Sequence, residues 1–287
     1  MVRYLVFTLA FTDGFILFLF SFNLLILLIL ALINRHNCSY EHQQEKENSR
    51  IDDKNLPKVT IQIPLFNEKY VAARAIAGVC RVNYPKEKLQ IQILDDSVDE
   101  TIIISRHETE KYRKLGIDIQ VIHRKARIGF KGGALRNGLE QASGEFVAVF
   151  DADFVPEKEM LRKIIPFFVK DESLGMIQTR WGHLNTGFSP LTRAEAILID
   201  CHFSIDQTAR GGSSLFMNFN GTAGVWRSSC ILDAGNWQDD TVTEDLDLSY
   251  RAELRGWKMR YFQDIVSPGE LPALMDAYKI QYRELLP

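Results

Sequence analysis

The sequence has few cysteines, and it shows none of the common cysteine or histidine motifs. The four cysteines lie far apart, without a C-x-x-C pair, at positions 38, 80, 201 and 230. This spacing argues against a disulfide framework or a zinc knuckle, and it suits a reducing compartment. The six histidines show no H-E-x-x-H or similar spacing, so a histidine-ligated metal is not expected.

The chain also has no large excess of positive or negative charge. The chain of 287 residues carries 34 Lys and Arg against 37 Asp and Glu, which gives a net charge of −3. This balance does not indicate nucleic-acid binding, and we expect no nucleic-acid partner. With 46% hydrophobic and 25% charged residues, the composition is that of a globular protein with one large domain or two small ones.

Charge is absent altogether from residues 15–33, which read FILFLFSFNLLILLILALI. A helix of this length measures about 29 Å, the thickness of a hydrocarbon core. A cleaved signal peptide is the alternative, but its apolar region is shorter and is followed by small residues, unlike Asn34-Arg35-His36. We therefore expect a membrane anchor at 1–34, with a transmembrane helix at about 15–33. Asp13 and Gly14 interrupt the apolar stretch before it, so a second span is not expected.

Basic residues flank this helix unevenly. Arg3 precedes it, whereas Arg35, Lys46 and Arg50 follow it. Cytoplasmic flanks of membrane helices are enriched in Lys and Arg. The pattern predicts a single-pass membrane protein in which everything after Ile33 lies in the cytoplasm.

A polar linker at 35–57 leads into a region in which apolar runs alternate with helical stretches. The runs that are typical of buried strands lie at 59–63, 89–94, 117–122 and 146–150. The helical stretches lie at 69–81, 99–115 and 133–142. This alternation predicts an α/β fold with a mostly parallel sheet and helices on both faces. Right-handed crossovers would bring the polar residues after each strand to one edge of the sheet.

The second half of the chain is less regular. We expect helices at 190–208 and 243–255, a loop-rich segment at 211–224 and a short strand near 258–262. A helical stretch within 272–287 ends the sequence. The globular domain is therefore expected to span 58–271.

Two acids follow the last of the four apolar runs. Asp151-Ala152-Asp153 comes directly after Phe146–Phe150. Carboxylate oxygens are hard ligands that suit Mg²⁺ or Mn²⁺, and the end of a buried strand is where open α/β sheets bind ligands. Helix capping is the structural alternative, but a cap needs one Asp rather than two. The pair predicts a divalent cation held against a diphosphate.

Asp95-Asp96-Ser97 occupies the equivalent place after another strand. It has a structural interpretation, because Ser97 and Glu100 fit a capping box and Asp is a common turn residue. It also has a functional one, because a carboxylate there can accept hydrogen bonds from a nucleobase or a ribose hydroxyl.

The segment His123–Ala134 packs four Arg and Lys residues and three glycines into a strand-to-helix turn. Glycines let the backbone approach a ligand, a helix N-terminus favours anions, and basic side chains bind phosphate. The segment has neither the P-loop nor the G-x-G-x-x-G pattern. The alternative is a solvated basic loop.

Two later stretches also allow both interpretations. Phe219–Trp226 contains small residues flanked by aromatic ones, which fits a tight turn or a surface that a sugar approaches. Thr243–Leu248 begins a helix that Thr243 can cap and whose acids suit the helix dipole. Three acids within four residues exceed that need, and one of them facing Asp153 would be placed to accept a proton.

Taken together, the ordered motifs resemble family-2 glycosyltransferases of the cellulose-synthase-like and mannan-synthase-like branch, from about Lys58 to Ala277. The motifs are IPLFNE (63–68), LDDS (94–97), GFKGGAL (129–135), FDADF (150–154), QTRWGHLN (178–185), FNGTAG (219–224) and TEDLDLSYR (243–251). The resemblance implies a GT-A fold, a nucleotide-diphosphate sugar donor and an inverting β-glycosyl transfer at a cytoplasmic membrane face. The membrane would be the cell inner membrane, or the Golgi membrane in a eukaryote.

The resemblance also implies roles for individual residues. Asp245 looks like the general base, and Asp151 and Asp153 look like the D-x-D pair that holds Mg²⁺ or Mn²⁺, with Asp153 the more direct ligand. Asp96 resembles the nucleobase- and ribose-side acid, and Lys131 the cation on the diphosphate side. The donor side would further include Pro64, Phe66, Asn67 and Glu68. The acceptor side would include Phe219, Asn220, Gly221, Thr222, Glu244, Gln281 and Arg283.

The sequence departs from the family pattern at its C-terminal end. The family has a Q-x-x-R-W motif followed by membrane spans, whereas here Gln281-Tyr282-Arg283 is one residue short and lacks the Trp. We expect transfer of a hexose from a UDP-glucose or GDP-mannose type of donor to a growing β-glycan, with membrane partner subunits for secretion. The alternatives are transfer of one sugar to a lipid acceptor, and a catalytically impaired truncated homologue that only binds nucleotide sugar.

Overall fold

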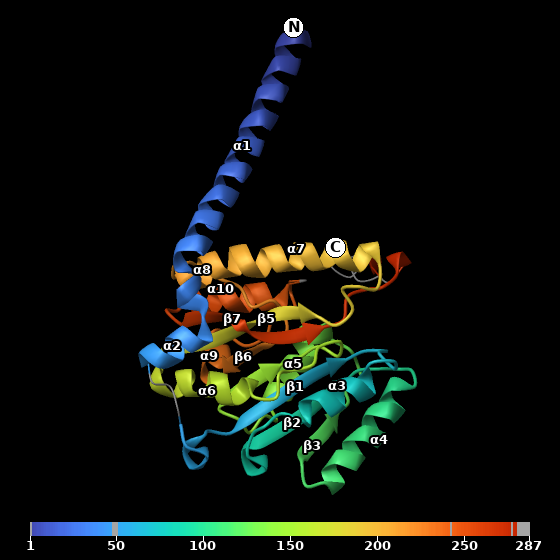
Figure 1. The fold of residues 1–287 in the computed structure, drawn as a ribbon. Helices are drawn as coiled ribbons and strands as arrows, with labels where there is room; N and C mark the ends of the chain where they lie inside the picture. Colours follow the sequence, from blue (N-terminus) through green and yellow to red (C-terminus); the bar gives the residue numbers. More distant parts are fainter. Residues whose placement is uncertain (1, 48–50, 242, 277, 280–287) are drawn as a thin grey trace.

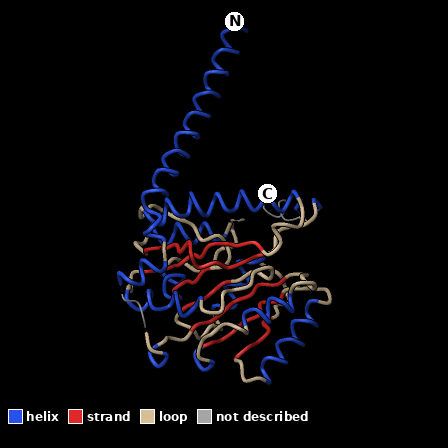
Figure 2. Tube along the Cα trace, in the orientation of Figure 1, coloured by secondary structure: helices blue, strands red, loops and turns tan. Residues whose placement is uncertain are grey.

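The computed structural model describes residues 2–47, 51–241, 243–276 and 278–279. Within these residues the domain is built on a seven-stranded sheet with strand order β3-β2-β1-β4-β6-β5-β7 (Figure 2). The strands are β1 (Val59–Leu65), β2 (Leu89–Asp95), β3 (Asp118–Ile122), β4 (Phe146–Val149), β5 (Leu174–His183), β6 (Gly224–Arg227) and β7 (Lys258–Gly269). Only β6 runs antiparallel to its neighbours, which confirms the mostly parallel sheet.

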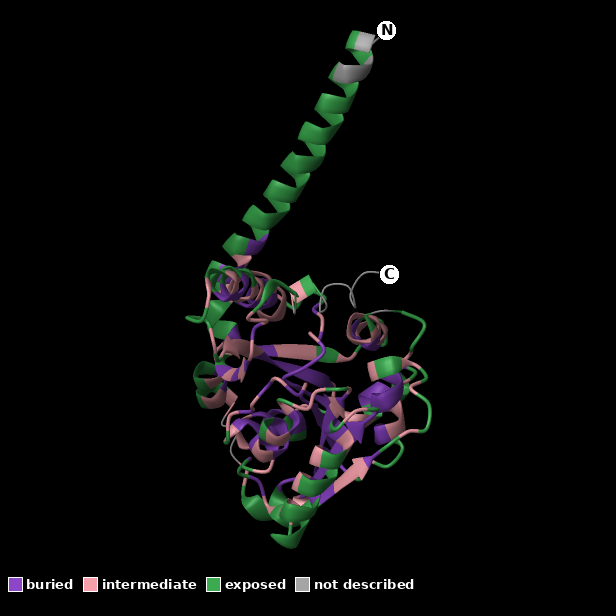
Figure 3. Cartoon of the chain, turned by 90° about the vertical axis from the view of Figure 1, so that its right-hand side faces the viewer, coloured by how far each residue is buried: buried purple, intermediate pink, exposed green. Residues whose placement is uncertain are grey.

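Helices cover both faces of this sheet, as predicted (Figure 1). The helices of the domain are α3 (Ala72–Val79), α4 (Thr101–Lys114), α5 (Phe130–Leu139), α6 (Met160–Lys170), α7 (Pro190–Cys201), α8 (Thr208–Gly212), α9 (Ser228–Asp233) and α10 (Glu244–Leu254). Side chains of α3 and α6 pack with Ile61 and Ile91 on one face. Side chains of α5, α9 and α10 pack with Val147 and Val149 on the other face. Most residues of the strands between these layers are buried (Figure 3).

The carboxyl ends of β1, β2 and β4 meet at one edge. Leu65, at the end of β1, pairs with Asp95 at the end of β2. Phe150, just after β4, donates its backbone N–H to the carbonyl of Gln62 in β1 at 3.0 Å. The polar residues that follow each strand are therefore neighbours in space, as expected for parallel strands joined by right-handed crossovers.

Strands β5 and β6 and helix α6 are among the elements that were not predicted from the sequence. β5 interrupts its apolar run with Gly175 and with polar residues, and β6 is four residues long and lies inside the small-residue stretch that was read as a turn. Pairing with β4 and β5 makes β6 a strand, and this long-range contact leaves no local signal. α6 was missed, and β7 extends to Gly269 rather than ending near Phe262.

The N-terminal helix α1 (Val2–Asn34) projects away from the domain (Figures 1 and 3). It is longer than expected, because Asp13 and Gly14 lie within it without breaking it. It is long and apolar enough to cross a membrane, and most of it is exposed in the structure. Its lower end packs Leu27 and Ala31 against Ala209 of α8.

The polar stretch that was expected to be a linker contains a docked helix, α2 (Tyr40–Glu47). Ser39 Oγ and the Tyr40 N–H donate to the carboxylate of Asp264 in β7, at 2.9 and 2.7 Å. Arg260 of β7 forms an ion pair with Glu47 at 2.8 Å. These polar contacts fix the foot of α1 to the sheet, and composition alone does not reveal them.

Candidate active site

Lys131 joins three segments that are distant in the sequence. It lies in the first turn of α5, which follows the basic glycine-rich turn. Its Nζ lies 2.6 Å from Asp151 Oδ1 and donates a hydrogen bond to the carbonyl oxygen of Gly221 at 3.0 Å. The structure thus brings together the turn after β3, the D-x-D pair after β4 and the loop before β6.

Asp245 completes this arrangement from the first turn of α10. Gly221 has φ +77°, and a Cβ placed there would lie 3.1 Å from Asp245 Oδ2 and 3.4 Å from Lys131 Nζ. A side chain at this position would enter the space between the acid and the base, so glycine suits both the backbone angle and the room available. The neighbouring Glu244 packs its side chain against Gly132 of α5.

The loop before β6 also fixes the D-x-D pair. Thr222 is fully buried, and its Oγ1 accepts the backbone N–H of Asp151 at 2.8 Å. Gln178 of β5 holds the same loop, because its Oε1 accepts the N–H of Asn220 at 3.0 Å. Thr222 therefore acts on the site through the backbone of Asp151 rather than by facing a ligand.

The site has an excess of acids over bases. Burial, together with the charges of Asp151 and Asp153, raises the pKa of Glu68 to about 8. Burial and the charge of Asp151 likewise raise the pKa of Asp153 to about 7. Burial also raises the pKa of Asp245, against the lowering effect of Lys131.

The acidic side chains of the site also change the pKa of Lys131. Burial alone would lower its pKa, but Asp151, Glu244 and Asp245 outweigh that effect and raise it. Lys131 therefore stays protonated in this surrounding. It is a fixed positive charge in a site that would otherwise repel a diphosphate.

The donor set fits a hard divalent cation. Asp151 and Asp153 supply carboxylate oxygens, and a bound cation would offset both the burial and the repulsion by Asp151 that raise the pKa of Asp153. Within the described part of the chain, no three Asp, Glu, His or Cys side chains are grouped closely enough to hold a metal by themselves. Mg²⁺ is commonly held by one or two carboxylates together with substrate phosphates and water, and this set matches that pattern.

Asp96 lies at the end of β2, where it forms a paired contact with Arg124. Arg124 Nε donates to Asp96 Oδ1 at 3.0 Å, and its Nη2 contacts Asp96 Oδ2. The two side chains are 14% and 5% exposed. Arg124 also donates to the backbone carbonyls of Ile128 and Phe130, at 2.8 and 2.9 Å. This arginine, expected to bind phosphate, instead shapes the glycine-rich turn that places Lys131.

Replacing Arg124 by Gln should leave the buried Asp96 without its charged partner. We expect Arg124→Gln to lower the free energy of unfolding by about 3 kcal/mol, because breaking a buried ion pair strands a charge. Urea denaturation followed by circular dichroism measures this. Arg136→Gln is the matched control, since its ion pair with Asp239 is 38% and 31% exposed and should contribute under about 1 kcal/mol. Equal losses in the two variants would contradict the assignment.

The residues at the end of β1 and just after it lie beside the glycine-rich turn that precedes α5. The guanidinium of Arg127 stacks on the ring of Phe66, 3.4 Å from its centroid. Asn67 has φ +56°, and its Oδ1 accepts the backbone N–H of Val98 at 3.0 Å. Pro64 lies within β1, next to its end. Asp96 donates its backbone N–H to the carbonyl of Leu65 at 3.0 Å, so the chain at the end of β1 runs beside Asp96, and its donor-side role stays a prediction.

For Phe219 and Ser97, the structure shows other contacts than the expected ones. Phe219 is fully buried against Trp226 and Trp237, so its ring belongs to the core and does not face an acceptor. Ser97 does not form the capping box with Glu100, because its Oγ accepts the Asn67 N–H at 2.9 Å.

Four further residues with predicted roles are Thr243, Asn220, Gln281 and Arg283. Thr243 makes no side-chain cap to α10, which removes the structural alternative for that residue. Asn220 Oδ1 accepts from Asn218 Nδ2 at 3.1 Å and lies 2.9 Å from His202 Nε2. Gln281 and Arg283 lie outside the described residues, as does most of the expected terminal helix.

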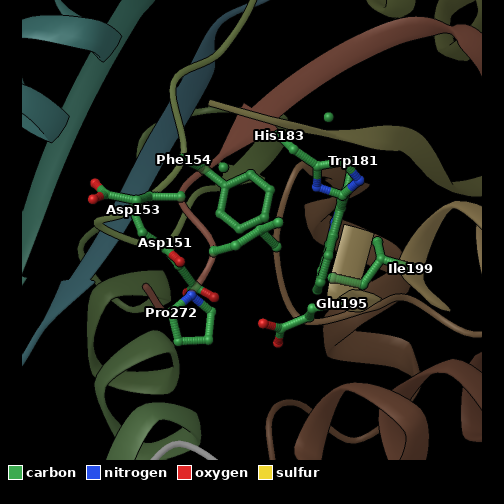
Figure 4. A pocket seen from close by; sticks show the side chains of 12 residues that line it. Asp151, Asp153, Phe154, Trp181, His183, Glu195, Ile199 and Pro272 are labelled. Carbon is green, nitrogen blue, oxygen red and sulfur yellow. The ribbon is translucent and has the colours of Figure 1, made fainter. Parts of the chain in front are cut away.

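A cavity of about 80 Å³ opens beside the D-x-D pair (Figure 4). Asp151 and Asp153 lie on one side, and Trp181, His183 and Glu195 lie on the other. Sequence reasoning did not place these three residues in the site. Trp181 and His183 were visible within the QTRWGHLN motif, whereas Glu195 lies in α7 with no motif around it.

The sequence is similar to a known protein family and to several curated proteins. A family model described as glycosyltransferase like family 2 matches residues 57–280. Glucomannan 4-beta-mannosyltransferase 2 of Arabidopsis thaliana is 37% identical over 263 residues, which cover 90% of this chain and 49% of that protein. Glucomannan 4-beta-mannosyltransferase 1 of Oryza sativa subsp. japonica is 40% identical over 230 residues, with 79% and 44% coverage. The chain spans about half the length of the curated relatives it matches.

Solved structures share the fold at low sequence identity. The mannosyltransferase PcManGT from Pyrobaculum calidifontis, in complex with GDP-Man and Mn²⁺, has a TM-score of 0.65 at 18% identity, covering 89% of this chain and 72% of that one. S. aureus TarS in complex with UDP-GlcNAc has a TM-score of 0.57 at 18% identity, covering 77% and 60%. The predicted GT-A type of α/β fold is thereby confirmed.

Proposed function

The chain belongs to glycosyltransferase family 2, and from this premise we propose that it transfers a hexose from a nucleotide-diphosphate sugar to a β-linked glycan, with inversion at the anomeric carbon. One observation carries the proposal. Lys131 lies against Asp151 on one side and next to Gly221 and Asp245 on the other. A cation-binding pair, a fixed positive charge and a buried acid therefore border one space.

Lys131 has the role of stabilising the leaving group. Cleavage of the sugar–phosphate bond leaves a nucleoside diphosphate on which negative charge accumulates. The protonated ammonium of Lys131, already positioned by Asp151 and by the Gly221 carbonyl, lies where this charge develops. Such preorganised charge stabilises a transition state without reorganisation.

Asp151 and Asp153 would hold Mg²⁺ or Mn²⁺. When bound, the cation supplies Lewis-acid charge that offsets the negative charge of the diphosphate. The two carboxylates leave its remaining positions to diphosphate oxygens and water. The PcManGT complex, which contains GDP-Man and Mn²⁺ and shares this fold, supports this assignment.

Asp245 takes the proton of the acceptor hydroxyl. Burial raises the pKa of Asp245, which makes its carboxylate a stronger base than a solvated one. Attack by the acceptor oxygen on the face opposite the departing diphosphate inverts the anomeric centre. Glu244 and Asn220 lie beside this space and would contact the acceptor, together with the backbone at Gly221.

The relatives support the proposed donor, and α1 supports the proposed membrane topology. The names of the curated relatives favour a mannosyl donor such as GDP-mannose and a β-1,4-linked glycan acceptor. The length and apolar composition of α1 support a single-pass anchor, with the domain on the cytoplasmic side. The glycan would thus be extended at a membrane surface, where membrane partner subunits could take it further.

The test is a transfer assay with the full chain in lipid nanodiscs. GDP-mannose and UDP-glucose are supplied separately with Mn²⁺ and short β-1,4-linked acceptors, and the products are identified by mass. We expect elongation with one donor and none when EDTA replaces Mn²⁺. Sugar appearing only on lipid would identify a glycolipid-forming enzyme. Nucleotide-sugar binding by calorimetry without product or free nucleoside diphosphate would refute the transferase proposal.

A further inference from the structure

Glu195 is a buried acid that the mechanism above does not use. It lies in α7 and is 7% exposed. Its Oε2 is buried and has no hydrogen-bond partner, and no ion pair with Glu195 occurs among the residues that the structure describes. Burial without compensation raises the pKa of this carboxyl. Burying a carboxylate without a hydrogen-bond donor is unfavourable in free energy, so we expect a bound ligand to supply that donor.

The surroundings of Glu195 indicate what that partner is. Glu195 lines the cavity that begins at the D-x-D pair, and its carboxylate lies on the side opposite Asp151 and Asp153 (Figure 4). Ile199, four residues later on the same face of α7, lines the cavity beside it. Trp181 adds an aromatic wall, and its indole packs against Phe154 with ring centroids 5.0 Å apart.

We propose that Glu195 is a sugar-binding residue, whose carboxylate accepts hydrogen bonds from hydroxyl groups of a hexopyranose that lies against Trp181. This proposal rests on the function proposed above and names the group that fixes the sugar ring in the transfer site. Sugars offer pairs of hydroxyl donors and apolar C–H faces. A carboxylate that only accepts, on the same side of the cavity as an aromatic side chain, matches both features.

A second metal would be the other way to satisfy Glu195. Among the described residues, however, no group of three possible metal ligands includes it. His183, the histidine of this cavity, is held instead by Asp200, at 3.1 Å between its Nε2 and Oδ1 of the carboxylate. The cavity therefore places the Glu195 carboxylate beside an aromatic wall and apolar side chains, across from the carboxylates of Asp151 and Asp153, which is the chemistry of a sugar subsite.

The hexopyranose could be the donor sugar or the end of the acceptor glycan, and kinetics separate the two. Glu195→Gln and Glu195→Ala are assayed in nanodiscs with each substrate varied in turn. We expect the KM of the substrate that contacts Glu195 to rise at least tenfold, since a hydrogen bond to a charged group is lost. The KM of the other substrate and the affinity for free GDP or UDP should stay unchanged.

Glu253→Gln is the matched control. Glu253 is also a partly buried acid with an unpartnered Oε2, and burial raises its pKa to about 7. It lies in α10 but borders a separate cavity of about 490 Å³, beside the foot of α1. Its replacement should change neither KM. Thermal melts of the variants distinguish binding from structure, because removing an uncompensated acid should leave the melting temperature of Glu195→Gln equal or higher.

Calorimetric titration of hexose and short glycans into the GDP- or UDP-loaded protein gives a readout that does not depend on transfer. If the wild type binds sugar and both Glu195 variants bind it at least tenfold more weakly, the inference stands even where no transfer occurs. If the variants keep both KM values and the sugar affinity of the wild type, Glu195 is not a sugar ligand. A wild type that binds no sugar at all would overturn the inference as well.

Discussion

Asp245→Asn lowers kcat by about 10²–10⁴-fold and leaves donor binding unchanged, because the variant keeps the shape of the side chain but cannot accept the acceptor's proton. The carboxylate lies beside Gly221 and Lys131, and burial raises its pKa. The first turn of α10 would keep its backbone geometry, since the Asp245 side chain accepts only the Leu246 N–H, at 2.8 Å. Initial rates with saturating donor, together with calorimetry of nucleotide binding, measure the two effects separately.

Asp247→Asn provides the comparison for this variant. Asp247 lies on the same helix, two residues later, but forms an ion pair with Arg251 at 2.6 Å and does not contact Lys131. We expect it to retain most of the activity. If Asp245→Asn turned over at the wild-type rate, Asp245 would have no role as the base, and Glu244 would be the next residue to test.

Asp153→Ala abolishes the metal dependence of nucleotide binding. We expect the affinity for GDP or UDP in Mn²⁺ to fall at least about 100-fold, or about 2.7 kcal/mol, to the value measured in EDTA. The reason is electrostatic, because Asp151 is already engaged by Lys131 at 2.6 Å and cannot replace both carboxylates. Calorimetry with and without Mn²⁺ measures the difference directly.

The comparison for this experiment is Asp118→Ala. Asp118 begins β3, at the opposite end of the strand from the ligand edge, and its side chain is 55% exposed. Its removal should leave the Mn²⁺-dependent affinity unchanged. An Asp153→Ala protein that still binds nucleotide more tightly with Mn²⁺ than without would show that the cation lies elsewhere.

Both predictions concern acids that could be chosen from the sequence. Asp151 and Asp153 follow a run of buried residues, and the parallel sheet fixes where the end of such a run must lie. Three acids crowd one helix start, and the resemblance to the family then singled out Asp245 among them. The order of the motifs then indicated the family, and the family model agrees over residues 57–280.

Other expectations failed because a long-range contact outweighed a local signal. Phe219 looked like a residue beside a sugar, but the packing of Trp226 and Trp237 buries it. Arg124 looked like a phosphate ligand, but Asp96, from a different strand, binds it. Strand β6 looked like a turn, because four residues become a strand only when β4 and β5 lie on either side.

The sequence by itself determined the fold class, the apolar N-terminal helix and the acids at the strand ends. Hydrophobic periodicity and the alternation of strands with helices are local features of the sequence, and right-handed crossovers between parallel strands bring those ends to one edge. Tertiary structure alone decided which charges meet. Lys131, Asp151 and Asp245 are brought to one space by the crossing of α5, β4 and α10, and α7 packs so that Oε2 of Glu195 has no hydrogen-bond partner in the described part of the chain. Charge pairing depends on distances of a few ångström between segments that are remote in the chain, and no local pattern encodes such distances.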